Sequence, residues 1–414
     1  MPQLTNLADL MEKRLPAELV EFMQEAGLVA AGGGQSLYLV GGVVRDLLLG
    51  RINLDLDLAV TGDAIAFARQ LSGISEAKIT THPRFRTVKL SRGEWSVDIA
   101  TVRSESYDKP GALPAVRPGT IKEDLFRRDF TINAMAVELT PSRWGRLIDL
   151  YGGKEDLKNG LIRILHEDSF IDDATRIWRA LRYEQRLDFK LEPKTLRLLK
   201  QNIGMLETIS GDRIRHELEL VLKEGLPEKV IRRADKLGVL AQLYPGLKGD
   251  GWLARKFAAA RKFSAPNVPV AELYLALLAY RLNAEEAEKL ISRLKLSKLQ
   301  ARTLTESNSL KAELGALDEP ILQPSCIYTV LIDYKPSAII TNYLATDSQA
   351  VKKNIKLFLN KLRNIKPALT GNDLQKMGIP PGPRMKGILH LLLEARLDGE
   401  VKDRRGEVEL VGRS

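Results

Sequence analysis

The chain has 414 residues, of which 44% are hydrophobic and 28% are charged, as in globular proteins of two to four domains. Its single cysteine, Cys326, excludes an internal disulfide framework, and no apolar run approaches the roughly 20 residues that span a bilayer. These features predict a protein of the reducing cytoplasm, without a membrane partner. The 63 Lys and Arg against 53 Asp and Glu give a net charge of +10, which favours a polyanionic partner.

The predicted elements of the first 150 residues alternate between helices and strands. Apolar spacing predicts helices at 7–23, 43–49 and 64–71, and strands at 37–40, 55–60, 87–90 and 95–102. From about residue 160 the pattern predicts helices only, at 173–187, 195–203, 211–224, 228–237, 252–262, 271–280, 284–294, 349–365 and 384–398. The fold class is therefore α+β, with an amino-terminal sheet domain followed by an all-α region.

Two carboxylates lie on one predicted strand. Asp55 and Asp57 alternate with leucines, so both acids are expected on one face and Leu54, Leu56 and Leu58 in the core. A divalent metal such as Mg²⁺ would relieve the repulsion between two such carboxylates. A solvent-facing acidic strand face is the alternative.

A third acid, Asp98, is presented in the same way between Val97 and Ile99. If its strand neighbours the first, three carboxylates converge, as a two-metal phosphoryl or nucleotidyl transfer requires. Taken alone, an acid such as Asp98 is more often just an exposed strand acid.

A double glycine follows the first predicted strand. Gly41 and Gly42 allow close backbone approach, the next helix begins there, and Arg45 lies one turn in, beside Asp46. This pattern indicates a phosphate cradle in which Arg45 binds phosphate oxygens. It is neither a Walker loop nor a dinucleotide motif, and a plain tight turn remains the alternative.

Four arginines share one face of the predicted helix at 173–187. Arg176, Arg179, Arg182 and Arg186 lie on a stripe that begins at Asp173, opposite an apolar side. Such cations repel one another unless an anion lies against them. A solvated basic face is the alternative.

These motifs together resemble the class II tRNA nucleotidyltransferases and bacterial poly(A) polymerases, of the polymerase β-type superfamily. The resemblance includes Gly41-Gly42-x-x-Arg45-Asp46, Asp55-x-Asp57 and Arg127-Arg128-Asp129-Phe-Thr-Ile-Asn133. It continues through Asp172-Asp173-Ala-Thr-Arg176, Gly211-Asp212-Arg213 and Leu369-Thr-Gly-Asn-Asp373, and so covers nearly the whole chain. Asp172, Ala174 and Asp188 depart from the usual family residues, whereas Asp173 and Arg176 match.

The resemblance implies roles for individual residues. Asp55, Asp57 and Asp98 would be the catalytic acids and Mg²⁺ ligands, and the nucleotide-binding set would comprise Gly41, Gly42, Arg45, Asp46, Arg128, Asp129, Asn133, Asp173, Arg176, Arg179 and Arg182. Asp129 and Asn133 would recognise the ribose, although Asn133 alone could be a helix-capping amide. Asp173 and Arg176 would read the base edge of CTP or ATP. Arg179 and Arg182 would hold phosphate or base.

The resemblance also implies a domain division and a substrate. A nucleotidyltransferase head (1–150) would precede an α-helical neck (151–225), body (226–330) and tail (331–414), elongated in arrangement. The substrates would be CTP, ATP and tRNA, bound through its acceptor and T arms, with no obligatory protein partner evident. The Pro/Gly-rich loop at 107–120 is expected to be flexible, which argues against an enzyme that adds only CC.

The activity expected from these motifs is two-metal addition of CMP and AMP to the 3′ end of tRNA, as the complete CCA sequence. The alternatives are an enzyme that adds only A or only CC, a poly(A) polymerase, or an RNA-binding protein that has lost activity. No strongly basic extension follows residue 403, which argues against the poly(A) polymerase. Intact Asp55, Asp57 and Asp98 argue against the inactive binder.

Overall fold

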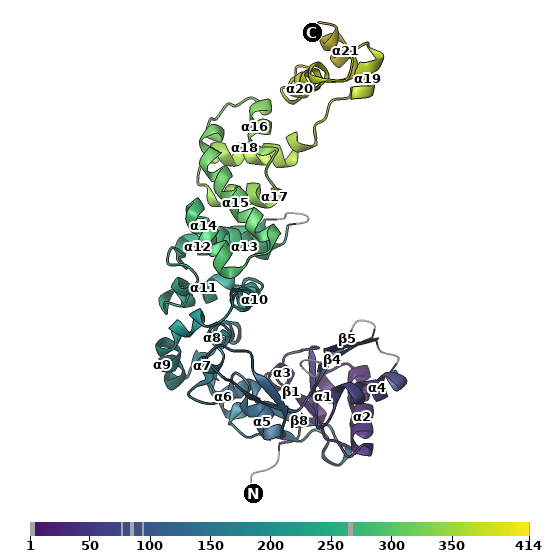
Figure 1. The fold of residues 1–414 in the computed structure, drawn as a ribbon, viewed down its shortest axis with the longest axis vertical. Helices are drawn as coiled ribbons and strands as arrows, with labels where there is room; N and C mark the ends of the chain where they lie inside the picture. The colour runs from purple at the N-terminus through teal and green to yellow at the C-terminus, as the bar shows by residue number, and fades with distance from the viewer. Residues whose placement is uncertain (1–4, 76–77, 83–86, 93–94, 264–267, 414) are drawn as a thin grey trace. The chain divides into compact units, whose positions relative to one another are not determined.

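The computed structural model describes residues 5–75, 78–82, 87–92, 95–263 and 268–413. Contacts divide the chain into two compact units, residues 1–217 and 218–414. The predicted α+β class is confirmed, because a mixed sheet fills the first unit and helices make up the second (Figure 1). The finer division into head, neck, body and tail stays a prediction.

A seven-stranded sheet forms the centre of unit 1, in the order β3-β4-β5-β2-β1-β8-β9. Its strands are β1 (Leu37–Val40), β2 (Leu56–Val60), β3 (Lys78–His82), β4 (Thr87–Arg92), β5 (Trp95–Thr101), β8 (Met135–Glu138) and β9 (Leu147–Asp149). Within this sheet, β2–β5 is the one parallel pair among the described residues. All four residues of β1 and of β8 are buried, as central strands covered on both faces require.

Ten helices accompany this sheet in the described part of unit 1. They are α1 (Ala8–Arg14), α2 (Ala17–Gly32), α3 (Gly42–Leu48), α4 (Ala64–Ser75), α5 (Ile121–Phe126), α6 (Gly153–Asn159), α7 (Ser169–Asp172), α8 (Thr175–Leu187), α9 (Pro193–Gln201) and α10 (Gly211–Leu222), which continues into unit 2. The helix predicted at 7–23 is divided in two, because Pro16 precedes α2 and cannot continue α1.

Four short strands correct the sequence-based expectations. Inside the region of the predicted loop at 107–120, β7 (Ala115–Pro118) pairs with β6 (Arg103–Ser106), so the loop is the connection of a hairpin. After residue 160, where helices alone were expected, β10 (Leu161–Ile162) pairs with β11 (Lys190–Leu191). Two-residue strands are too short to show alternation in the sequence.

Unit 2 is helical throughout its described residues. Its elements are α11 (Pro227–Lys236), α12 (Gly251–Lys262), α13 (Val270–Ala279), α14 (Ala284–Leu294), α15 (Lys298–Glu313), α16 (Pro324–Leu331), α17 (Pro336–Ala345), α18 (Gln349–Asn360), α19 (Gly371–Lys376), α20 (Pro383–Leu397) and α21 (Arg404–Gly412). Proline at the first position begins α11, α16, α17 and α20, and capping boxes begin α14, α15 and α19.

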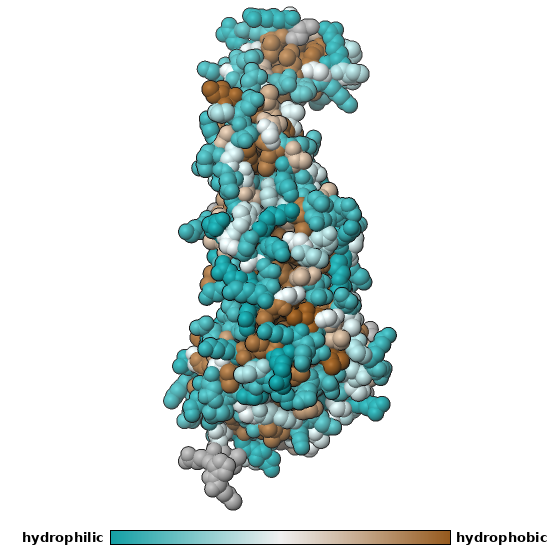
Figure 2. All heavy atoms as spheres, turned by 90° about the vertical axis from the view of Figure 1, so that its left-hand side faces the viewer, coloured by the Kyte–Doolittle hydropathy of each residue, from teal (hydrophilic) through white to brown (hydrophobic). Residues whose placement is uncertain are grey.

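Polar side chains predominate on one face of the molecule. Figure 2 shows one face on which hydrophilic side chains prevail and hydrophobic ones lie in small separate groups. None of the helices in the described residues is long and apolar enough to cross a membrane.

Candidate active site

The predicted acids lie where β2 and β5 run side by side. Asp57 on β2 pairs in register with Asp98 on β5, so the strand adjacency that the sequence left open is present. Asp55 comes just before β2 and is exposed, and its backbone N–H donates to Asn53 Oδ1 at 2.9 Å. Because the strand begins at Leu56 rather than Asp55, Leu54 lies outside it and is exposed, which corrects its predicted place in the core.

Asp57 is the least compensated of these acids. Burial, the nearby Asp55 and the nearby Asp98 raise the pKa of Asp57 to about 6, although Arg128 and Lys89 act in the opposite direction. Asp98 Oδ2 accepts a hydrogen bond from Lys89 Nζ at 3.2 Å, in a pair that is about half exposed on both sides. Negative charge therefore accumulates at Asp57, and a bound cation would lower the free-energy cost of keeping this carboxylate ionised.

The oxygen ligands present suit Mg²⁺ chemically. Nevertheless, among the residues that the structure describes, no three His, Cys, Asp or Glu side chains are close enough together to hold a metal ion by themselves. A cation at Asp57 and Asp98 would therefore take further ligands from substrate and water, as Mg²⁺ usually does. The catalytic and metal-binding roles of the three acids stay predictions.

A cavity of about 290 Å³ opens beside the acids. Its lining includes the acids Asp57 and Asp98 together with three cations, Arg103, Arg127 and Arg128. Arg128 Nη2 donates to the buried Asp124 at 2.9 Å, while its Nε is buried with no hydrogen-bond partner among the described atoms. An unsatisfied guanidinium N–H next to a carboxylate pair is suited to a ligand that carries both phosphate and metal.

Gly41 brings the backbone to the edge of this cavity. It ends β1 with φ at +79°, and a Cβ atom there would lie 3.0 Å from Arg128 Nη1 and 3.5 Å from Asp57 Oδ2. A side chain would strain the turn and approach both functional groups. The predicted turn at Gly41 and Gly42 therefore belongs to the site, and Gly42 is the first residue of α3.

Arg45 does not face this cavity. Its buried guanidinium forks onto Asp46 through Nε and Nη2, at 2.9 and 2.8 Å, and its Nη1 donates to Asn133 Oδ1 at 2.8 Å. Asn53 Nδ2 also donates to Asp46. The acidic partner of Arg45 is thus the protein's own Asp46 rather than an open phosphate position, and binding of phosphate by Arg45 would require this pair to open.

The Asn133 amide connects Arg45 to Asp129. Asn133 Nδ2 donates to Asp129 Oδ1 at 3.0 Å, and Arg179 donates to Asp129 Oδ2 through Nε at 2.8 Å and Nη2 at 2.5 Å. Burial alone would raise the pKa of Asp129, but Arg179 and Asn133 hold it below its ordinary value. Asn133 is therefore no simple helix cap. The buried Asp46, Arg45, Asn133 and Asp129 and the partly buried Arg179 form one hydrogen-bonded chain, here called the arginine network.

The arginines of α8 converge on Tyr183. The guanidinium carbons of Arg45, Arg179 and Arg182 lie 5.2, 5.8 and 5.1 Å from its ring centroid. Glu217, on α10, lies 3.8 Å from Arg179 and 3.9 Å from Arg182. The stripe is thus mostly buried against protein carboxylates and an aromatic ring, and only Arg186 is exposed, so a fully solvated basic face is wrong.

The predicted base-reading pair is held by other partners. Asp173 Oδ1 accepts from Thr175 and from Arg213 Nη2, the latter at 2.7 Å. Arg176 is buried and donates to Ser169 Oγ at 2.7 Å and to the carbonyl oxygen of Arg127 at 2.7 Å. Reading of a base by Asp173 and Arg176 would therefore exchange some of these bonds.

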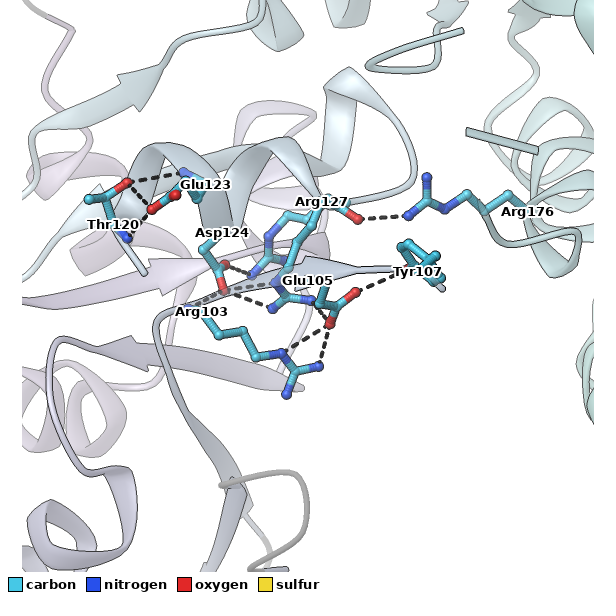
Figure 3. A network of polar contacts seen from close by, with 9 residues as sticks. Arg103, Glu105, Tyr107, Thr120, Glu123, Asp124, Arg127 and Arg176 are labelled. Carbon is cyan, nitrogen blue, oxygen red and sulfur yellow. Dashed lines mark hydrogen bonds and ion pairs between the residues drawn. The ribbon is translucent and has the colours of Figure 1, made fainter. Parts of the chain in front are cut away.

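A second polar cluster connects the hairpin to the cavity (Figure 3). Glu105 on β6 accepts from Arg103, Tyr107 and Arg127, and Asp124 on α5 accepts from Arg127. Arg127 thereby joins two buried carboxylates with its side chain and binds Arg176 with its backbone. This cluster fixes the segment that carries Arg128 and Asp129.

Sequence reasoning missed several of these residues. Lys89, Glu105, Asp124, Tyr183 and Glu217 have no spacing that distinguishes them from surface positions. Arg213 carried a signal, because it belongs to a Gly-Asp-Arg segment that resembles the family, although no role was attached to it.

Comparison with known proteins places this site in a class. Residues 37–163 match the family described as Poly A polymerase head domain, and residues 188–250 match one described as probable RNA and SrmB-binding site of polymerase A. The site thus lies on a nucleotidyltransferase head followed by an RNA-binding segment, as those families are described.

Full-length relatives extend the similarity. An A-adding tRNA nucleotidyltransferase of Halalkalibacterium halodurans is 32% identical over 98% of this chain and 94% of its own length. One of Geobacter sulfurreducens is 34% identical over 99% of this chain, which spans only 48% of that longer relative. A solved apo CCA-adding enzyme superposes with a TM-score of 0.85 at 33% identity over both whole chains, and the Thermotoga maritima CCA-adding enzyme complexed with tRNA with 0.79 at 32%, also over both whole chains. The chain belongs to the class II tRNA nucleotidyltransferase family.

Proposed function

We propose that this protein adds CMP and AMP, taken from CTP and ATP, to the 3′ end of tRNA in the cytoplasm, completing the CCA sequence. The observation that carries the proposal is the Asp57–Asp98 pair across β2 and β5, which lines one cavity together with Arg103, Arg127 and Arg128. Carboxylates and guanidinium groups around one cavity are what a nucleoside triphosphate with its cation requires.

The residues around the cavity would have separate roles in this reaction. Asp55, Asp57 and Asp98 would hold Mg²⁺, which when bound would activate the RNA 3′-hydroxyl and neutralise the triphosphate. Arg128, held by Asp124 and left with an unsatisfied Nε, would contact a phosphate oxygen. Gly41 would keep the wall of the cavity clear for this contact.

Base selection would depend on Asp173 and Arg176. The Asp173 carboxylate can accept from the exocyclic amine that cytosine and adenine share, and Arg176 can donate to a ring nitrogen or to the cytosine carbonyl. Guanine and uracil present no amine donor at that position. Asp129 and Asn133 would recognise the ribose, and a deoxynucleotide would leave buried polar groups unpaired.

A-only addition is the second candidate, because the relatives of Geobacter and Halalkalibacterium are both named A-adding enzymes. The structural neighbours named CCA-adding enzymes favour the complete reaction. Both reactions use the same site, so only the product distinguishes them.

The test offers the purified protein tRNA transcripts that end before CCA, after C and after CC, each with CTP, ATP or both. Addition of three residues that then stops supports the complete reaction. Extension of the CC-ended transcript alone by one A identifies the A-adding enzyme, and arrest after CC or a long A ladder identifies the CC-adding enzyme or the poly(A) polymerase. No extension of any transcript overturns the proposal.

Base selection is tested separately. The variants Asp173→Ala and Arg176→Ala are expected to lose discrimination against GTP and UTP in the same assay. Unchanged discrimination in both variants would contradict the role of this pair.

A further inference from the structure

Unit 2 contains a large groove far along the sequence from the active-site residues. It has a volume of about 830 Å³ and lies among the end of α12, the start of α13, α17 and α18. Its walls include Phe263, Ile340, Tyr343 and Leu359. A concavity of this size with mostly apolar walls is typical of ligand sites. It is here called the α17–α18 groove.

Cations surround this groove. Lys335, Lys356 and Arg363 line it and are exposed, and among the described residues none of the three forms an ion pair. Its one lining carboxylate, Glu272, already accepts a hydrogen bond from Thr303 Oγ1 at 2.6 Å. The groove therefore carries a net positive charge without an acidic protein partner.

The sequence around these cations strengthens this conclusion. From residue 348 to residue 372 there is no Asp or Glu, whereas six cations occur: Lys352, Lys353, Lys356, Lys361, Arg363 and Lys366. An acid-free stretch of this kind is stable beside a polyanion and repels itself otherwise. The ligand is accordingly expected to be anionic at more than one point.

The walls also provide aromatic groups. The rings of Phe263 and Tyr343 lie 5.4 Å apart at 49°, and both side chains are only half-buried. Asn360, which is exposed at the groove, offers an amide that can donate and accept. A planar base, a polar base edge and flanking phosphates match this combination of aromatic, amide and cationic groups.

We propose that the α17–α18 groove binds an unpaired nucleotide of the RNA substrate, with its base against Phe263 and Tyr343 and its adjoining phosphates at Lys335, Lys356 and Arg363. An RNA strand fits better than a free nucleotide, because the three cations come from two separate parts of the chain and can meet successive phosphates. This inference rests on the proposed function, since it presupposes an RNA substrate.

The test measures binding of a tRNA transcript lacking its terminal A to three variants of the full chain. Lys356→Ala/Arg363→Ala is expected to raise the Kd about tenfold or more at 0.15 M salt and to reduce its salt dependence. Tyr343→Leu is expected to raise the Kd about fivefold with an unchanged salt dependence. The matched control, Lys353→Ala/Lys366→Ala, removes two exposed cations of the same segment outside the groove and is expected to change the Kd less than about threefold.

A second measurement locates the base. Photo-crosslinking of the same transcript containing 4-thiouridine, followed by mass spectrometry, is expected to yield adducts on the peptides of Phe263 or Tyr343. Adducts only elsewhere would overturn the proposal, and so would equal effects of the groove and control pairs. Specific binding of free AMP at the groove, without crosslinks to RNA, would overturn it in favour of a mononucleotide site.

Nucleotide incorporation at saturating tRNA separates this proposal from the proposed function. If the wild-type protein extends no RNA, the proposed function fails. If the wild-type protein extends tRNA and the groove variants bind and extend it equally well, the groove proposal alone fails.

Discussion

Unit 1 contains two neighbouring groups of charged side chains that are built in opposite ways. In the arginine network every buried charge has a close partner, from Asp46 and Arg45 through Asp129 to Arg179. On the central strand β2, Asp57 has two acids nearby and no directly bonded cation among the described contacts, and its pKa is raised to about 6.

This difference distinguishes a structural network from a ligand-binding site. A fully paired network stabilises the fold by fixing its side chains, and removal of one member leaves a charge without its partner. A carboxylate without a cationic partner destabilises the free protein. A ligand that supplies the missing positive charge removes this cost. Substitutions in the first group should therefore act on folding, and substitutions in the second on activity.

The largest effect is expected at Asp57 on β2. Asp57→Ala should lower the rate of nucleotide incorporation by about a thousandfold or more, roughly 4 kcal/mol in activation free energy, because the acid that would hold the cation is lost. The melting temperature should be unchanged or higher. The control is Asp9→Ala, an exposed acid of α1, and full activity of Asp57→Ala would eliminate Asp57 as a catalytic residue.

In the arginine network the effect should appear in stability. Asp129→Ala leaves the partly buried Arg179 without its carboxylate and should lower the free energy of unfolding by about 1.5–3 kcal/mol. Urea denaturation measures this change. Glu285→Ala, which breaks an exposed pair with Lys289, should cost much less, because solvent screens that pair. Equal costs for the two variants would show that the network does not support the fold.

Gly41 lies against Arg128 and Asp57, and its substitution should lower both stability and activity moderately. Gly41→Ala places a Cβ at φ +79° and 3.0 Å from Arg128 Nη1, so it should cost about 1–3 kcal/mol of stability and reduce incorporation. The control is Gly315→Ala, where a Cβ meets no atom within 4 Å. A stable and fully active Gly41→Ala protein would contradict the close approach described above.

The smallest effect concerns pH. The folded pKa of Asp57, about 6, lies above the 3.8 of the free group, so the folded state binds the proton more tightly and Asp57 lowers stability as pH rises from 4 to 6. After allowance for partial exposure, Asp57→Asn should be more stable than wild type by about 1 kcal/mol above pH 6 in chelator, and equal to it below pH 4. Denaturation curves across this range measure the difference, and a difference independent of pH would contradict the raised pKa.

The sequence predicted the strands with clear alternation and the helices with clear periodicity. The strand at 95–102 and the helix at 284–294 correspond closely to β5 and α14. By contrast, α15 was not predicted, because its buried face includes Thr303 and Ser307 beside Leu304 and Leu310. These hydroxyls bond to Glu272 and to the backbone inside the helical core, and such partners cannot be read from spacing.

The acids of the candidate site could be predicted from the sequence, but the partners of its arginines could not. Asp57 and Asp98 are recognisable because they alternate with apolar residues on predicted strands, whereas the partners of Arg45 and Arg179 depend on tertiary contacts. An arginine in a motif reads equally well as a ligand-binding group and as the counter-ion of a buried carboxylate. In the structure Arg45 pairs with Asp46 and Arg179 pairs with Asp129.

Arg127 contacts both the polar cluster of Glu105 and Asp124 and the predicted base-reading residue Arg176. This double contact has a thermodynamic consequence. Its side chain binds Glu105 and Asp124, and its carbonyl oxygen accepts from Arg176. If the proposed nucleotide draws Arg176 away, this carbonyl is freed, and any resulting shift of the segment would change the energy of the phosphate binding proposed for Arg128. By reciprocity, the triphosphate would then change the affinity for the base by the same factor, so that discrimination between bases would become sensitive to the number of phosphates on the nucleotide.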